Sequence, residues 1–232
     1  RHAGDGRITA GLRGEGEGTG EDLRNTQRIY PLAKYDKNGV GSSELCLERE
    51  TGRPVWQTEI SSILGAGANF GYGGRLVTNL TLLTEWGGVL YVQTSHGTVA
   101  ALDSMNGNIR WLSQYRRSVQ GNKYGQEVQE IRPANGPIFH RGVLYVLPQD
   151  ASDLMAFDGS TGRKMDLAVP KVQDRNLDWK GVSHLIGIYR EWMILGGNES
   201  YVVRMKDFKA FSLPMVKTSR CGLATVEGDR VY

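Results

Sequence analysis

A short turn signature recurs along this chain at a constant spacing of 55 residues. Each copy has an acidic residue, then a glycine four positions later and, in two copies, a tryptophan four positions further on. A repeat constrains the fold strongly, because a unit that cannot bury its own apolar faces must stack against its copies. The signature residues are Glu48, Gly52, Trp56, Asp103, Gly107, Trp111, Asp158 and Gly162, with Asp166 in place of the third tryptophan.

Each signature residue has a structural explanation. An acidic side chain at the start of a turn accepts hydrogen bonds from backbone N–H groups, and glycine supplies a positive φ without a Cβ clash. A tryptophan on the following strand is a large apolar plate that packs between sheets. We therefore expect these positions to stabilise the fold rather than to carry chemistry.

The sequence upstream of each signature reads as strands. Residues 87–103 and 141–158 each contain two alternating apolar segments around a polar turn, and residues 78–84 and 137–140 supply a shorter strand before them. The unit is thus four consecutive antiparallel strands joined by hairpins. Glycine, at 31 of 232 residues, fits a chain with many tight turns.

Stacked four-stranded units predict an all-β fold, a β-propeller. We expect a Gly-rich flexible lead-in at residues 1–24 and a partial propeller at residues 25–232. About four blades are expected, either as a fragment or incomplete ring or, alternatively, as a closed four-bladed ring. The expected units are residues 25–60, 78–113, 134–169 and a degenerate copy at 184–216, with a further one starting at 221–232.

The pattern VLYV-x4-G-x-V-x-ALD-x3-G-x3-W at residues 89–111 resembles the PQQ-like repeat. That repeat is found in quinoprotein dehydrogenases and in the lipoprotein propeller of the outer-membrane β-barrel assembly machine. The resemblance covers residues 44–232 and is strongest at 87–111 and 141–162. It implies a non-catalytic binding or assembly scaffold, periplasmic or otherwise extracytoplasmic, that binds a protein partner or the remaining blades and needs no cofactor in this chain.

The same resemblance leaves an enzymatic alternative, a fragment of a quinoprotein dehydrogenase dependent on PQQ and Ca²⁺. The resemblance implies a disulfide between two adjacent cysteines, as in quinoprotein dehydrogenases, whereas Cys46 and Cys221 are far apart in this sequence. Their metal ligands match no position in this chain, and an eight-bladed ring needs more than 232 residues. Under this alternative the cofactor site lies in blades outside this sequence.

Two linkers between units, residues 114–132 and 171–181, carry the polar excess of the chain. Linkers of a propeller share a face, so insertions there build a contact surface. Basic and aromatic side chains gather in the first linker, while a net charge of only +3 gives no reason to expect nucleic acid. The candidate surface, for a protein partner or for a carbohydrate or peptide, comprises Tyr115, Arg116, Arg117, Lys123, Tyr124 and Arg132.

Other motifs give weaker signals. His96, His140 and His184 are spaced by 44 residues, which is not the repeat length, so they fall at different places in their units and are not expected to share a metal. The glycines at 65–71 lack the strand and helix context of a dinucleotide loop, so we expect a loop between blades. We expect Cys46 and Cys221 to be buried reduced thiols.

The sequence says little about compartment. Apolar runs such as residues 142–146 and 192–195 are far shorter than the roughly 18 residues of a membrane helix. No signal peptide is visible after Arg1, and a chain from which a signal peptide had been removed would look the same. Of two glycosylation sequons, Asn79 is expected inside a strand and Asn198 at an exposed hairpin tip.

Overall fold

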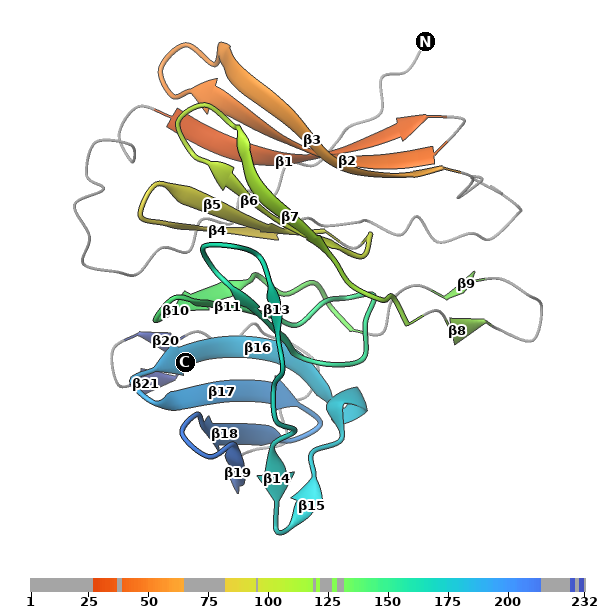
Figure 1. The fold of residues 1–232 in the computed structure, drawn as a ribbon, viewed down its shortest axis with the longest axis vertical. Coiled ribbons are helices and arrows are strands. Elements are labelled where there is room, and N and C mark those ends of the chain that lie inside the picture. The colour runs from red at the N-terminus through yellow and green to blue at the C-terminus, as the bar shows by residue number, and fades with distance from the viewer. Residues whose placement is uncertain are drawn as a thin grey trace. The chain divides into compact units, whose positions relative to one another are not determined.

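The computed structural model describes residues 27–36, 39–64, 82–94, 96–118, 120–121, 127–128, 132–213, 226–227 and 230–231. The chain divides into two compact units, Arg1–Tyr115 and Arg116–Tyr232 (Figure 1). In the described part of the chain the only helix is the short 3₁₀ helix η1, Trp179–Gly181, so no described helix could cross a membrane.

Unit 1 contains two antiparallel sheets. The first sheet has three described strands in the order β1-β2-β3, and the second has four in the order β4-β5-β6-β7 (Figure 1). Each strand pairs with the next along the chain, as the hairpin pattern predicts. The strands are β1 Gln27–Asp36, β2 Gly39–Glu48, β3 Pro54–Leu64, β4 Leu82–Trp86, β5 Val89–Gln93, β6 Thr98–Asp103 and β7 Ile109–Gln114.

The core of unit 1 lies between these two sheets. Leu90 and Val92 of β5 point to one face of the second sheet, because alternate residues of a strand share a face. They pack in a buried cluster with Ile60 of β3, so the first sheet covers this face. Leu83, Ala100 and Leu102 complete the cluster, and Trp56 packs against it.

Unit 2 repeats the four-stranded plan twice. Its first sheet has the order β10-β11-β12-β13, and the consecutive strands β16 to β19 form most of the second. This confirms an all-β fold built from four-stranded antiparallel sheets. The strands are β10 Ile138–His140, β11 Val143–Val146, β12 Met155–Asp158, β13 Lys164–Met165, β16 Val182–Tyr189, β17 Trp192–Gly197, β18 Ser200–Arg204 and β19 Lys209–Leu213.

The linkers of unit 2 contribute strands that the sequence did not reveal. β14, Lys171–Val172, pairs with β15, Arg175–Asn176, and runs parallel to β19, so it extends the second sheet. The linker at 171–181, expected to be a contact loop, is thus part of the fold. Short pairs also form between β8 Gln120–Gly121 and β9 Glu127–Val128 and between β20 Val226–Glu227 and β21 Arg230–Val231.

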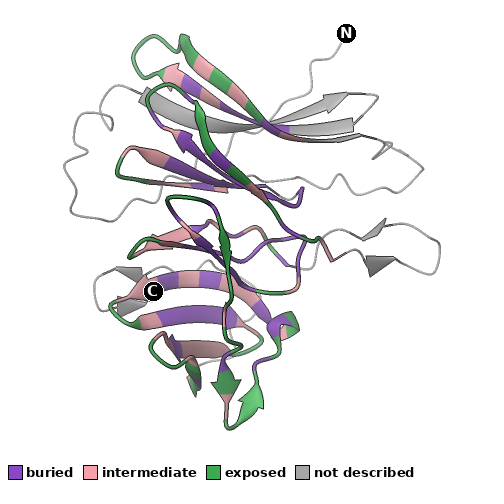
Figure 2. Ribbon diagram, in the orientation of Figure 1, coloured by how far each residue is buried: buried purple, intermediate pink, exposed green. Residues whose placement is uncertain are grey.

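The core of unit 2 joins its two sheets. Tyr145 and Ala156 of the first sheet share a buried cluster with Leu195 and Val203 of the second, where β17 is buried along most of its length (Figure 2). Trp179 from η1 lies in the same cluster. The linker between the sheets therefore supplies a core residue as well as the connection.

The three signature turns have the same geometry. Gly52, Gly107 and Gly162 have φ of 69°, 73° and 72°, a region that L side chains rarely adopt. The N–H of each glycine donates to the carbonyl of the acidic residue four positions earlier, at 2.8 or 2.9 Å. The Asp158 carboxylate also accepts from the N–H groups of Ser160 and Thr161, at 3.0 and 2.9 Å. Structure thus accounts for the repeat.

The fourth unit keeps this turn without its signature residues. Between β18 and β19, Arg204 stands in the acidic position and Phe208, with φ of 52°, in the glycine position. Arg204 donates to the Asp207 carboxylate at 2.9 and 2.6 Å and so closes the turn by an ion pair instead. The copy at 184–216 is therefore degenerate in sequence but keeps a positive φ at this position.

Asn135, in the segment that precedes β10, is hydrogen-bonded to β16 of the second sheet, and its removal is expected to destabilise unit 2. Its Nδ2 donates to the Ser183 carbonyl at 3.0 Å and its Oδ1 accepts from the Leu185 N–H at 2.9 Å. Asn135→Ala leaves these buried groups unpaired, which should cost about 2 to 3 kcal/mol in chemical denaturation. The control is Asn198→Ala, at an exposed asparagine, which should change the free energy of unfolding by less than about 0.5 kcal/mol. An equal loss of stability in both variants would contradict the structural role of Asn135.

Candidate functional site

A cavity of about 400 Å³ in unit 2 brings together part of the predicted contact surface. One wall is the start of the first linker, residues 116–118, and another is the turn between β11 and β12. We call this cavity the linker pocket. Its polar lining consists of Arg116, Arg117, Ser118, Ser152, Asp153 and Lys164.

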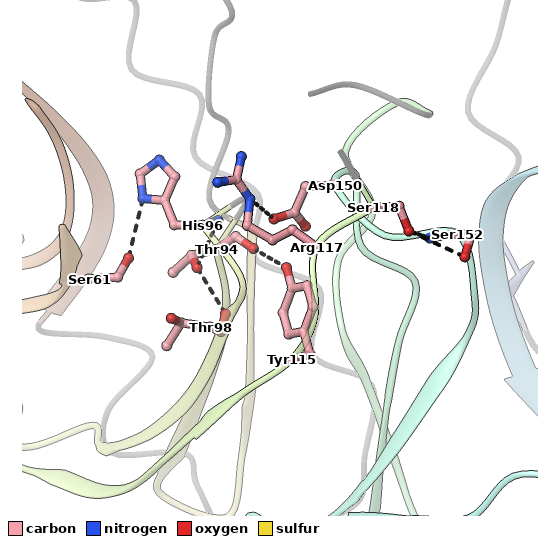
Figure 3. A network of polar contacts seen from close by, with 9 residues as sticks. All are labelled: Ser61, Thr94, His96, Thr98, Tyr115, Arg117, Ser118, Asp150 and Ser152. Carbon is pink, nitrogen blue, oxygen red and sulfur yellow. Dashed lines mark hydrogen bonds and ion pairs between the residues drawn. The ribbon is translucent and has the colours of Figure 1, made fainter. Parts of the chain in front are cut away.

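Backbone and hydroxyl contacts fix the linker to this turn. The Ser118 N–H donates to the Asp150 carbonyl at 2.8 Å. The Ser152 N–H donates to the Ser118 hydroxyl at 3.1 Å, and the two hydroxyls lie 3.4 Å apart (Figure 3). Ser118 and the preceding residue, Arg117, are therefore held at a defined place on the turn.

Arg117 has a structural role in the turn between β11 and β12. Its Nε donates to the Asp150 carboxylate at 3.1 Å (Figure 3), and the Asp150 side chain is only 2% exposed. Breaking a buried ion pair by removing one partner leaves an uncompensated charge, so the loss of Arg117 would disturb the turn. Sequence reasoning found Arg117 but had no signal for Asp150, because the partner lies 33 residues away.

Arg132 is the buried cation of the site. It is 5% exposed, and one Nη donates to the carbonyl of Ser152, a residue of the pocket wall. Its Nε and other Nη have no hydrogen-bond partner among the described residues. Burial lowers the pKa of Arg132 to about 10 against the opposing effect of the Asp153 carboxylate, so the guanidinium remains charged at neutral pH.

The remaining cations of the pocket are exposed. Arg116 and Lys164 are both solvent-accessible and lie on the linker and on β13. With Arg117 and Arg132 they make four positive charges, against the carboxylates of Asp150 and Asp153. The pocket and its immediate surroundings therefore carry an excess of two positive charges.

The other predicted surface residues do not join this pocket. Tyr115 belongs to unit 1, is 8% exposed, and donates its hydroxyl to the Thr94 carbonyl at 2.8 Å (Figure 3). It therefore acts as a structural residue there. Lys123 and Tyr124 lie outside the described residues. Lys164 was missed, because nothing in the sequence brings β13 next to the linker.

A second cavity, of about 240 Å³, lies at the other end of the strands of unit 2, where the β10–β11 hairpin turns. We call it the turn pocket. It is also basic, but its arginines are on hairpin turns rather than on a linker. Its charged or titratable lining consists of His140, Arg141, Tyr145, Arg190, Glu191 and Lys206.

The three spaced histidines make separate local contacts. His96 Nδ1 lies 3.3 Å from the Ser61 hydroxyl in unit 1 (Figure 3). His184 Nδ1 lies 2.7 Å from the Ser183 hydroxyl, and burial lowers the pKa of both His140 and His184. Within the described ranges no three His, Cys, Asp or Glu side chains group as metal ligands do.

Two further residues singled out in the sequence can be placed. Cys46 is buried in β2, and burial raises the pKa of its thiol, while Cys221 lies outside the described residues. Asn198 is exposed in the turn between β17 and β18, as expected, whereas Asn79 is not among the described residues.

Comparison with known proteins identifies a family. A family model described as outer membrane protein assembly factor BamB matches residues 40–177, which is more than half of the chain. A sequence search of curated proteins finds no match.

Two solved structures show the fold. BamB from Moraxella catarrhalis is 16% identical, with a TM-score of 0.50 over 82% of this chain and 50% of that one. The β-propeller domain of Cps50 (Swd1) from Myceliophteria thermophila is 13% identical, with a TM-score of 0.50 over 84% and 56%. The likeness is that of a β-propeller, and this chain spans about half the length of either relative.

Proposed function

Because this chain belongs to the PQQ-like β-propeller family, whose matching model is described as outer membrane protein assembly factor BamB, we propose that it acts as a non-catalytic binding scaffold. The proposal places the contact with a protein partner at the linker pocket. The description of the family model, an assembly factor of outer membrane proteins, favours an extracytoplasmic, periplasmic setting. The scaffold needs no cofactor in this chain.

The linker pocket is the observation that carries this proposal. A contact surface needs side chains that are accessible and held at fixed positions. The Ser118 and Ser152 contacts fix the wall, and Arg116 and Lys164 present exposed charges from it. Exposed charges at an interface set partner choice and association rate.

The double variant Arg116→Ala, Lys164→Ala tests the surface without touching the Arg117 ion pair. We expect capture of the partner from envelope extract by the immobilised full-length protein to fall by about tenfold. The melting temperature should stay within about 2 °C, because both side chains are exposed.

The control is Arg141→Ala, Lys206→Ala, which removes the same charge from the turn pocket of the same unit. Capture should be unchanged in this control. Equal capture by the linker-pocket variant and the native protein would overturn the proposal. So would oxidation of alcohols or sugars by the full-length protein supplied with PQQ, Ca²⁺ and an artificial electron acceptor.

A further inference from the structure

The guanidinium of Arg132 is buried without enough acceptors. It has five N–H donors, and the only hydrogen bond it makes to a described residue is to the Ser152 carbonyl. Leaving donors of a buried charged group unpaired costs more than leaving those of a neutral group. Arg132 does not itself line the linker pocket, but it is hydrogen-bonded to Ser152 of the pocket wall, so its charge adds to the positive potential at the pocket.

The charges around Arg132 also select an anion. Arg117 and Asp150 neutralise each other, which leaves Arg116, Lys164 and Arg132 facing Asp153. Asp153 acts on Arg132 electrostatically, yet it makes no hydrogen bond to it. Two positive charges thus remain without a partner carboxylate in the described part of this site.

The neutral groups of the pocket argue against a sugar. The hydroxyls of Ser118 and Ser152 are used in holding the linker to the turn. No aromatic ring is among the described residues that line the cavity, so there is no flat apolar face for a sugar ring to stack on. The lining instead carries positive charge and guanidinium N–H groups, which can donate two parallel hydrogen bonds to one carboxylate.

We propose that the linker pocket binds carboxylate groups of an acidic peptide segment, with Arg116 and Lys164 as the exposed contacts and the buried charge of Arg132, behind the Ser152 wall, adding to the attraction. This inference rests on the proposed function, because it names the chemistry of the partner at the same surface. A cavity of about 400 Å³ accommodates one or two acidic side chains rather than a folded domain.

The test measures binding of a fluorescein-labelled octaglutamate peptide, amidated at its C-terminus, to the full chain by fluorescence anisotropy. Octaglutamine is the neutral control. We expect octaglutamate alone to bind, and to bind more weakly as salt rises from about 20 to about 200 mM. Arg116→Ala, Lys164→Ala should weaken binding at least about tenfold, and Arg132→Met, which removes a charge behind the pocket wall, about threefold. Arg116→Ala should weaken it about threefold.

Three controls separate a site from general attraction. Arg141→Ala, Lys206→Ala removes two charges from the turn pocket and should change the affinity less than about twofold. Arg132→Lys keeps the charge with fewer donors and should recover part of the binding if Arg132→Met lowers stability. Inorganic phosphate should compete no better than free glutamate.

Several outcomes would overturn the inference. These are no binding of octaglutamate, equal weakening by the turn-pocket variant, or displacement by phosphate at far lower concentration than by glutamate, which would assign the pocket to phosphate groups. If partner capture depends on Arg116 and Lys164 while octaglutamate does not bind, the inference fails and the proposed function stands. If the Arg116→Ala, Lys164→Ala variant loses octaglutamate binding but captures the partner as well as the native protein does, the inference stands and the proposed function fails.

Discussion

Glu44→Gln is expected to stabilise unit 1 at neutral and alkaline pH. Glu44 lies in the middle of β2 with no exposed surface, and neither carboxylate oxygen has a hydrogen-bond partner among the described residues. Burial raises the pKa of Glu44 from 4.5 to about 8. The folded chain therefore keeps a proton that the unfolded chain releases.

The sign of the pH dependence follows from this proton. Between pH 4.5 and about 8 the unfolded state binds fewer protons, so stability falls as pH rises, by about 1.4 kcal/mol per unit. The contribution of this proton to the free energy of unfolding is fully present below pH 4.5 and is lost as pH rises through about 8. The total loss is on the order of 4 to 5 kcal/mol. Glutamine cannot titrate, so the variant loses this dependence.

Chemical denaturation at pH 5 and pH 8 measures the effect. We expect the native protein and Glu44→Gln to be similar at pH 5 and to differ by several kcal/mol at pH 8. Glu59→Gln, at an exposed glutamate on β3, is the matched control and should follow the native protein at both pH values. A native-like pH dependence in Glu44→Gln would show that the carboxylate is not desolvated.

Gly107→Ala is expected to have the second large effect, about 3 to 4 kcal/mol of destabilisation. Part of the cost is the backbone, since φ at Gly107 is 73°. The rest is space, because an added Cβ would lie 2.5 Å from Cε3 of Trp56 and 2.7 Å from the Thr58 hydroxyl. Trp56 would have to leave its contact with the Ser104 carbonyl.

Gly52→Ala is the matched control for this prediction. Gly52 has nearly the same φ, 69°, in the equivalent turn, but an added Cβ there meets nothing within 4 Å. We expect only the backbone cost, about 1 to 2 kcal/mol, in chemical denaturation. In a Trp56→Ala background the cost of Gly107→Ala should fall but stay above this value, because the Thr58 hydroxyl still lies 2.7 Å from the added Cβ. Equal costs of the two glycine variants in the native background would contradict the contact with Trp56.

The sequence predicted the local part of the fold well. The spacing of Asp103 and Gly107 specifies a turn, and a turn depends only on neighbouring residues. The fourth turn was harder, because Phe208 adopts a positive φ that nothing about phenylalanine favours. There the Arg204–Asp207 pair and the strand pairing hold the backbone in place.

The candidate site was predicted only in part, because its contacts are distant in sequence. Arg116, Arg117 and Arg132 stood out as a basic cluster in a linker. Whether each is exposed, paired or buried depends on the turn before β12, which supplies Asp150 and Ser152. The burial of Glu44 could not be predicted from the sequence either, because it depends on which residues cover the sheet and not on β2 itself.

Strand β14 has a consequence for the behaviour of the protein in concentrated solution. A strand at the border of a sheet exposes unpaired N–H and C=O groups, onto which another molecule can add a strand and begin to aggregate. The Lys171 N–H donates to the Phe208 carbonyl at 3.1 Å, and Lys171 stands beside Lys209 in parallel register. The linker thus covers β19 with the short strands β14 and β15, which carry Lys171 and Arg175, and this blunts edge-to-edge association at β19.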